Sequence, residues 1–389
     1  MKITKVDLIP VKTERRSGAV SRHVVLKVHT DEGIVGLGEF SDLGIYRYMM
    51  PDLENLKIGV NKLMVGENPL DIVKFHQKVS KVLKYYGHHS MPIYPPYTLD
   101  SQLVAAMEMA MYDISGKYLN TPVYNLLGGK VRDTFEVTYP LFSCKSPEDI
   151  PARLDTVQQL YDEGWDRMRY YVGENLELDE KFLEAFRDRF GKKITLKALD
   201  FQRKMYWKDT LYWIERFKPF EFQLVESVSF GEDYEGMAEI RRRIDLPVSE
   251  HISSYANALR MIEYEAVDIF NVSIQIGGIY TALKFFHIGE AAGLKCLLST
   301  TQEMSIGTAA TPCHMGAVVP ELHYPGDVVG PVLYKQDVTK ERVKYVGPRM
   351  YLPEGPGLGV ELDEEKLAAL ESPLHEWEEI TSHAGVVVQ

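Results

Sequence analysis

Three short apolar runs in the middle of the chain each end in an acidic residue. They read ITLKALD, FEFQLVE and LPVSE, and they end in Asp200, Glu226 and Glu250, which stand 26 and 24 residues apart. Helical patterns between the runs make each repeat one strand-helix unit, and parallel strands wound this way carry their carboxyl ends to one end of a barrel. Converging carboxylates repel one another unless a cation lies between them, and carboxylates with waters suit Mg²⁺. The sequence therefore predicts a magnesium site formed by these three acids.

The same alternation of apolar runs and amphipathic helices continues on both sides of the acids. The runs cover residues 135–142, 167–173, 194–200, 220–226, 246–251, 267–274 and 295–300, and a weaker eighth lies near 321–324. Repeated strand-helix units favour a closed barrel, with an open doubly wound sheet as the alternative. We predict a modified (β/α)8, TIM-like barrel of the (β/α)7β kind over residues 126–335.

The flanking parts of the chain do not follow this repeat. Residues 1–125 show a strand near the N-terminus, a hairpin turned at residues 31–33 and two helical patterns, which together indicate an α+β domain. Residues 336–389 contain a glycine- and proline-rich turn and a short helix, and we expect this segment to pack back on the first domain.

The charge and cysteine content restrict the classes of partner. A formal charge of −12 argues against nucleic-acid binding, which needs a basic face. No apolar run approaches the 18 residues of a membrane span, so we expect no membrane insertion. Cys144, Cys296 and Cys313 show no disulfide or zinc spacing, and the N-terminus lacks the apolar core of a signal peptide. A cytoplasmic location is expected.

Several motifs together resemble those of the enolase superfamily, in its mandelate racemase and muconate lactonizing branch. They are TDEG at 30–33 with GLGE at 36–39, MAMYDISGK at 109–117, the three acid-ended strands, Gly277-Gly278 and PGLG at 356–359. The resemblance implies an N-terminal capping domain over the barrel. It also implies a Mg²⁺ ion that binds a substrate carboxylate and stabilises the enolate formed when the α-proton is removed.

The resemblance also assigns the metal ligands. Asp200 and Glu226 match the first two, whereas the third is open between two neighbours. Relatives place it four or five residues after a proline, and Glu250 lies three residues after Pro247 while His251 lies four after it. Glu250 is preferred because it shares the face of Val248 by the period of two along a strand.

The chain departs from the family where the base is expected. Relatives often carry Lys-x-Lys at the end of the second barrel strand, and here Arg169 and Tyr171 stand in its place. Both should enter the barrel, because residues two apart on a strand share a face. We predict Tyr171 as the catalytic base, with the Arg169 guanidinium favouring its anionic form. The alternative is that the pair only fills the barrel.

The other acid and base residues that relatives carry are missing from this chain, which favours a reaction with a single base. His251 is the one further titratable candidate. Gln202, Thr300 and Glu303 stand at or near positions that carry functional residues in relatives, so they are candidates for substrate binding. We expect a lyase that dehydrates an acid sugar or another hydroxy acid, a small-molecule carboxylate. A cycloisomerase or epimerase, and a metal-binding scaffold without catalysis, are the alternatives. Loops 14–24 and 42–52 are expected to select the substrate, and relatives suggest a homo-oligomer, either dimer or octamer.

Overall fold

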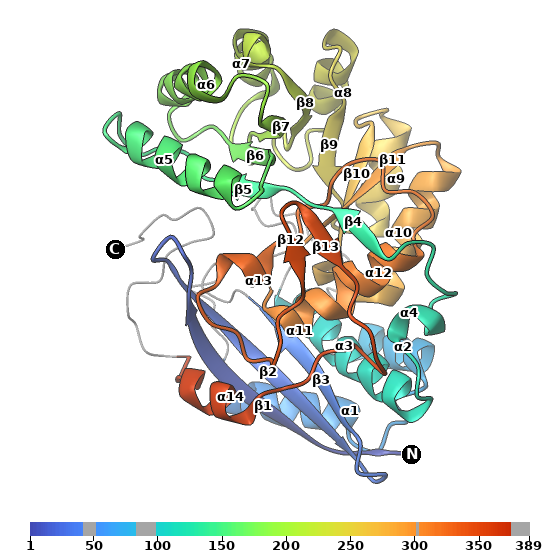
Figure 1. The fold of residues 1–389 in the computed structure, drawn as a ribbon. Helices are drawn as coiled ribbons and strands as arrows, with labels where there is room; N and C mark the ends of the chain where they lie inside the picture. Colours follow the sequence, from blue (N-terminus) through green and yellow to red (C-terminus); the bar gives the residue numbers. More distant parts are fainter. Residues whose placement is uncertain (42–51, 83–98, 301–302, 375–389) are drawn as a thin grey trace.

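The capping domain is built on an antiparallel three-stranded sheet. The computed structural model describes residues 1–41, 52–82, 99–300 and 303–374 (Figure 1), without the side chains of 310 and 311. The strands pair in the order β1-β2-β3 and are β1 (Ile3–Glu14), β2 (Val20–Thr30) and β3 (Val35–Phe40). Three helices complete the domain, namely α1 (Leu53–Met64), α2 (Ile72–Val82) and α3 (Leu99–Tyr118).

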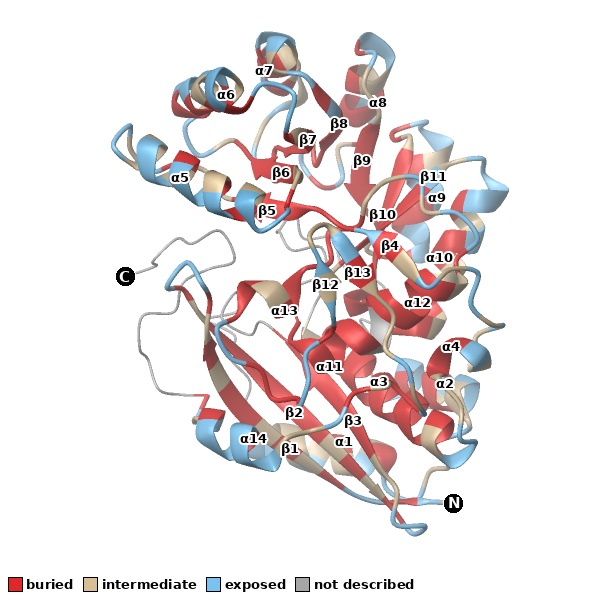
Figure 2. Ribbon diagram, in the orientation of Figure 1, coloured by how far each residue is buried: buried red, intermediate tan, exposed pale blue. Residues whose placement is uncertain are grey.

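Helix α3 packs against both the capping sheet and elements of the barrel. Nearly all of its residues are buried, on every side of the helix (Figure 2), which a helix packed on one face only would not show. Its approach to β3 is close, because a β-carbon at Gly38 would lie 2.1 Å from the carbonyl oxygen of Ala106. Glycine at this strand position therefore lets the sheet and the helix touch through their backbones.

The barrel consists of seven parallel strands that pair in sequence order. They are β5 (Tyr139–Leu141), β6 (Arg167–Tyr171), β7 (Thr195–Asp200), β8 (Phe222–Glu226), β9 (Val248–His251), β10 (Ile269–Ser273) and β11 (Lys295–Ser299). The helices between them are α5 (Asp149–Asp162), α6 (Leu176–Phe190), α7 (Trp207–Phe217), α8 (Tyr234–Arg243), α9 (Tyr255–Glu263) and α10 (Ile279–Ala291). Figure 1 shows these helices outside the strands.

A two-residue segment closes the ring. Gly326 bridges Val137 and Asp327 bridges Ser299, both in parallel orientation, so the segment joins β11 to the chain just before β5. The predicted modified barrel is confirmed and the open sheet is excluded. The eighth strand position lies at residues 326–327, two residues beyond the run near 321–324 in which it was expected.

One irregularity inside the barrel has consequences for the site. The β6–β7 register shifts between Met168, paired with Leu196, and Arg169, paired with Ala198, so Lys197 is an extra residue on β7. Such a bulge re-aims a side chain. The Lys197 side chain is fully buried. The interior layer beside it is apolar and consists of Ala198, Leu224, Ile269 and Leu297.

The C-terminal part returns to the capping domain. A short sheet of β4 (Thr134–Glu136), β12 (Tyr345–Val346) and β13 (Arg349–Tyr351) precedes it, with α4 (Val123–Leu126), α11 (Ser305–Thr308), α12 (His314–Val318) and α13 (Gly330–Leu333) at the domain junction. Helix α14 (Glu364–Leu370) is followed by a bridge between Glu371 and Val11 of β1. The boundaries at residues 125 and 335 stay a prediction. None of the described helices is long and apolar enough to cross a membrane.

Candidate active site

The carboxyl ends of three neighbouring strands carry the predicted site residues side by side. Tyr171 of β6 pairs with Asp200 of β7, and Asp200 pairs with Glu226 of β8. Both carboxylates are fully buried, as are most groups around them. The structure thus brings together Asp200 and Glu226 at the end of the barrel where the sequence placed them.

Arg169 lies between these two carboxylates. Its Nη2 donates to Asp200 Oδ2 and to Glu226 Oε1, the latter over 2.8 Å. The same guanidinium lies 4.6 Å from the ring centre of Tyr171, and this ring also stacks on Phe142. Burial raises the pKa of both Asp200 and Glu226 above the ordinary carboxyl value, although the Arg169 charge acts in the opposite direction. One arginine therefore does not fully compensate the two buried acids.

A second buried ion pair stands next to Arg169 and was not anticipated from the sequence. Lys197 Nζ donates to both oxygens of Asp327, over 2.7 and 2.6 Å, and Thr138 donates to Asp327 Oδ1 over 2.7 Å. Asp327 Oδ2 lies 3.5 Å from Arg169 Nη1. A lysine in an apolar strand run is a detectable signal, since lysine is almost never fully buried without a partner. Asp327 gave no such signal.

The two candidates for the third ligand occupy different places. Glu250 Oε1 accepts hydrogen bonds from Arg203 Nη2 over 2.8 Å and from the backbone N–H of His251 over 2.6 Å. His251 Nε2 lies 2.9 Å from Glu226 Oε1, and burial lowers the pKa of His251 to about 4, so its ring is neutral. The structure places His251 against Glu226 and pairs the preferred Glu250 with Arg203. Which of them would bind a metal stays a prediction.

The donor atoms at this site fit Mg²⁺ in type. Glu226 Oε2 and Asn271 Oδ1 are buried oxygens without a hydrogen-bond partner among the described residues. Two cations (Arg169, Lys197) against three carboxylates (Asp200, Glu226, Asp327) leave a formal charge of −1. Hard oxygen donors and a residual negative charge favour a divalent cation. Among the described residues, however, no three His, Cys, Asp or Glu side chains already form a ligand set.

The three predicted substrate-binding residues are held mainly by the protein itself. Gln202 Nε2 donates to the carbonyl of Val172 over 2.9 Å, and the backbone N–H of Thr300 donates to the carbonyl of Asp327 over 3.2 Å. Glu303 is fully buried and lies two residues before α11. The expectation for loop 42–52 concerns residues almost all outside the described part of the chain. The roles of Gln202, Thr300, Glu303 and this loop toward a substrate stay predictions.

Left-handed backbone follows both acids. Gln202 and Arg203 have φ of +58° and +59°, and Ser227, directly after Glu226, has +54°. Such conformations cost about 1–3 kcal/mol each for non-glycine residues and are concentrated at functional sites. They turn the chain sharply at the ends of β7 and β8, which keeps the two carboxylates at the mouth of the barrel.

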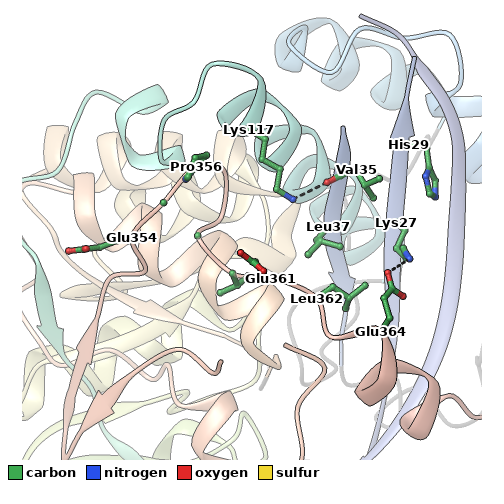
Figure 3. A pocket seen from close by; sticks show the side chains of 13 residues that line it. Lys27, His29, Val35, Leu37, Lys117, Glu354, Pro356, Glu361, Leu362 and Glu364 are labelled. Atoms are coloured by element: carbon green, nitrogen blue, oxygen red, sulfur yellow. Dashed lines mark hydrogen bonds and ion pairs between the residues drawn. The ribbon is translucent and has the colours of Figure 1, made fainter. Parts of the chain in front are cut away.

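A separate pocket of about 450 Å³ lies away from this site, between β2, β3 and residues 354–364 (Figure 3). The two lysines that line it are already engaged. Lys27 Nζ lies 2.5 Å from Glu364 Oε1, and Lys117 Nζ donates to the carbonyl of Val35 over 2.9 Å. The pocket lies where the C-terminal segment packs on the capping sheet, and protein groups already bind both of its lysines.

Comparison with known proteins gives enzymes with names of the isomerase type. The chain is 29% identical to an N-succinyl-L-Arg/Lys racemase of Bacillus cereus, over 95% of this chain and 98% of the relative. It is 26% identical to a muconate cycloisomerase 1 of Acinetobacter baylyi, over 89% and 91%, and 27% identical to an L-Ala-D/L-Glu epimerase of Clostridium acetobutylicum, over 90% and 94%.

Solved structures agree on the fold. The crystal structure of the Bacillus cereus N-succinyl Arg/Lys racemase superposes with a TM-score of 0.81 at 28% identity, over 96% of this chain and 99% of that one. A muconate lactonizing enzyme superposes with a TM-score of 0.84 over 96% and 100%, at 24% identity, which speaks for the fold alone.

Two family models cover most of the chain. One, described as the mandelate racemase / muconate lactonizing enzyme N-terminal domain, matches residues 1–128, and the other, described as enolase C-terminal domain-like, matches residues 152–366. The second match alone spans more than half of the 389 residues. The chain belongs to the enolase superfamily, in its mandelate racemase / muconate lactonizing enzyme branch.

Proposed function

We propose that this protein removes the proton α to the carboxylate of a small-molecule substrate and stabilises the resulting enolate. The observation that carries the proposal is the pairing of Asp200 with Glu226 at the ends of adjoining strands, beside Tyr171 and Arg169. Asp200 and Glu226 would hold Mg²⁺, with His251 or Glu250 as a further ligand. Bound Mg²⁺ would supply Lewis-acid stabilisation of negative charge on the substrate carboxylate.

Tyr171 is the base in this proposal. Its ring stacks on Phe142, with ring centres 5.1 Å apart, and contacts the Arg169 guanidinium. Its backbone carbonyl accepts a hydrogen bond from Ser143 Oγ over 2.7 Å. These contacts fix the direction of the phenol, and the adjacent guanidinium favours negative charge on the phenol oxygen. A positioned group of this kind contributes about 10²–10⁴-fold to a proton transfer.

The opposite side of the barrel favours outcomes that need one base. Asn271 and Ser273 on β10 and Ser299 on β11 are the polar residues at those strand ends, within the described residues, and none of them titrates near neutral pH. Racemisation needs a proton-transfer group on each face of the substrate, whereas cycloisomerisation needs one. We favour an isomerase over the dehydratase expected from the sequence, because these relatives carry isomerase names. Among isomerases we favour the cycloisomerase type, because it needs only one proton-transfer group.

The test is α-proton exchange in deuterated water with Mg²⁺, over unsaturated dicarboxylates, N-acyl amino acids and hydroxy acids. We expect one class to gain deuterium at the α-carbon, with ring closure of an unsaturated dicarboxylate as the net reaction. In that direction a carboxylate oxygen adds to the double bond and Tyr171 delivers a deuteron to the α-carbon of the resulting enolate, whereas removal of the α-proton by Tyr171 is the reverse, ring-opening step. Loss of water from a hydroxy acid would instead establish the dehydratase. Inversion of an N-acyl amino acid would show that a second base exists. Absence of exchange in every class would refute the proposal.

A further inference from the structure

The two carboxylates that would bind a metal already share a cation. Arg169 Nη2 contacts Asp200 Oδ2 and Glu226 Oε1 at once, so one nitrogen lies between the two strand ends. Arg169 is itself buried, and its Nε has no hydrogen-bond partner among the described residues. The guanidinium is thus held by charge but is not fully satisfied by hydrogen bonds in this position. A metal ion that takes these oxygens must compete with it.

A third carboxylate lies within reach of the same guanidinium. Asp327 Oδ2 is 3.5 Å from Arg169 Nη1, which is an ion-pair distance but too long for a good hydrogen bond. Lys197 and Thr138 hold Asp327 in place through three bonds of 2.6 to 2.7 Å. A small rotation of Arg169 toward Asp327 would strengthen one contact while it releases the other two.

We propose that metal binding here is an exchange of cations, in which Mg²⁺ takes Asp200 and Glu226 and displaces Arg169 toward Asp327. The inference rests on the proposed function, because it assumes that these two acids bind the metal. Arg169 is then an internal counter-ion that keeps the buried acids compatible with a folded apo protein. The Lys197–Asp327 pair is the positioning element that receives it.

The charges of the site agree with this exchange. The five groups carry −1 before the metal arrives and +1 afterwards, because Mg²⁺ adds two charges and Arg169 stays inside the site. A net positive charge attracts a carboxylate substrate.

Metal affinity measured by isothermal titration calorimetry with Mg²⁺, and with Mn²⁺ as a second probe, tests the exchange. Arg169→Met removes the competing cation, so we expect the full-length protein to bind either metal about tenfold or more tightly than the wild type. Arg167→Met is the matched control, since it removes the same charge from the start of the same strand, where Arg167 contacts Glu136 and Asp166. Its affinity should change by less than about twofold.

The receiving pair has its own variant. The double variant Lys197→Met/Asp327→Asn removes one cation and one anion, so the net charge of the site is unchanged. We expect it to bind metal several-fold more weakly, because the displaced Arg169 loses the third carboxylate. In the triple variant that also carries Arg169→Met, this weakening should disappear.

The outcomes separate the exchange from the proposed function. Equal or weaker metal affinity in Arg169→Met overturns the proposed exchange of cations. If the wild type still exchanges the α-proton of a substrate, the proposed function then stands without it. Binding in Arg169→Met without binding in the wild type supports the exchange in its strongest form. Binding in neither protein overturns it. Should Arg169→Met fail to fold by circular dichroism, Arg169→Lys replaces it, and a smaller gain in affinity is then expected.

Discussion

At the scale of single residues, the sequence predicted acids at neighbouring strand ends and Arg169 inside the barrel, but it did not predict which groups Arg169 pairs with. Asp200 and Glu226 could be placed because strand order and direction determine where a strand end lies. The partners of Arg169 could not, because a long side chain can reach several strands. Its contacts include Asp327, 158 residues further along the chain (327 − 169).

Tyr171→Phe tests the base directly. The phenyl ring keeps the packing against Phe142 and Arg169 but cannot accept the α-proton. We expect kcat for deuterium exchange to fall at least about 100-fold, with metal affinity changed little. Tyr170→Phe is the matched control, since the Tyr170 hydroxyl donates to Asp179 over 2.8 Å outside the barrel mouth. Loss of exchange in both variants to the same degree would argue against a specific role for Tyr171.

Lys197 shows how a local irregularity changes which groups a strand residue can reach. By the period of two, Lys197 lies on the opposite face of β7 from Asp200, yet the bulge lets it reach Asp327. We expect Lys197→Met to destabilise the protein by about 3–5 kcal/mol, because Asp327 is left as a buried charge. Adding Asp327→Asn should restore much of that loss, as measured by urea unfolding. Equal stability of the two variants would mean that Arg169 alone neutralises Asp327.

At the scale of elements, the motifs that carried the family resemblance tie the capping domain to the barrel. Glu39, at the end of β3, accepts hydrogen bonds from the backbone N–H groups of Met304 and Gly307 over 2.7 and 2.8 Å. Asp113 of α3 accepts those of Leu37 and Leu358, each over 2.9 Å. Buried carboxylates of this kind accept hydrogen bonds from backbone N–H groups that water cannot reach, and so hold the elements together. These motifs could be recognised from the sequence, but their partners lie 76 to 268 residues away along the chain.

Helix α6 contains an acid whose protonation should control stability. Asp179 is buried and accepts bonds from Tyr170 and from the backbone of Gly173, yet burial raises its pKa to about 7. Its folded pKa exceeds the unfolded value, so its contribution to stability is complete below about pH 4 and is lost as the pH rises through 7. The shift from 3.8 corresponds to about 4 kcal/mol.

The variant Asp179→Asn removes this titration. We expect the free energy of unfolding of the variant, relative to the wild type, to rise between pH 4 and pH 7.5 by a few kcal/mol. Denaturant unfolding at several pH values measures this difference. A difference that stays constant across the range would show that Asp179 titrates near its ordinary value.

At the scale of the whole molecule, the repeat of strands and helices was enough to predict the barrel, and the way it closes was not. Seven strands have apolar runs long enough to show a pattern. The eighth position is a pair of residues, Gly326 and Asp327, and two residues carry no periodicity. Closure depends on bridges to Val137 and Ser299, which only the folded ring brings together.

The capping domain and barrel should therefore unfold as one unit. Glu108 of α3 accepts the backbone N–H groups of Ile279 and Tyr280 at the start of α10, and His76 of α2 lies 2.7 Å from its Oε1. Gly278 makes room for it, since a β-carbon there would lie 2.1 Å from Glu108 Oε2. An acid from one domain thus caps a barrel helix, and leaving these N–H groups unpaired costs about 1–3 kcal/mol each.

Hydrogen exchange read by mass spectrometry in increasing urea tests this cooperativity. In the wild type, peptides from β1–β2 and from β7–β8 should lose protection at the same urea concentration. In Glu108→Ala the capping peptides should lose protection first, because α10 no longer holds α3, and Gly278→Ala should act in the same direction through the clash with Glu108. Glu239→Ala, which removes an exposed acid paired with Arg242 and Arg243, is the control and should leave the transitions coincident. Separate transitions in the wild type would show that the carboxylate ties position the domains without coupling their stability, because each domain would then hold its own core after the other has opened.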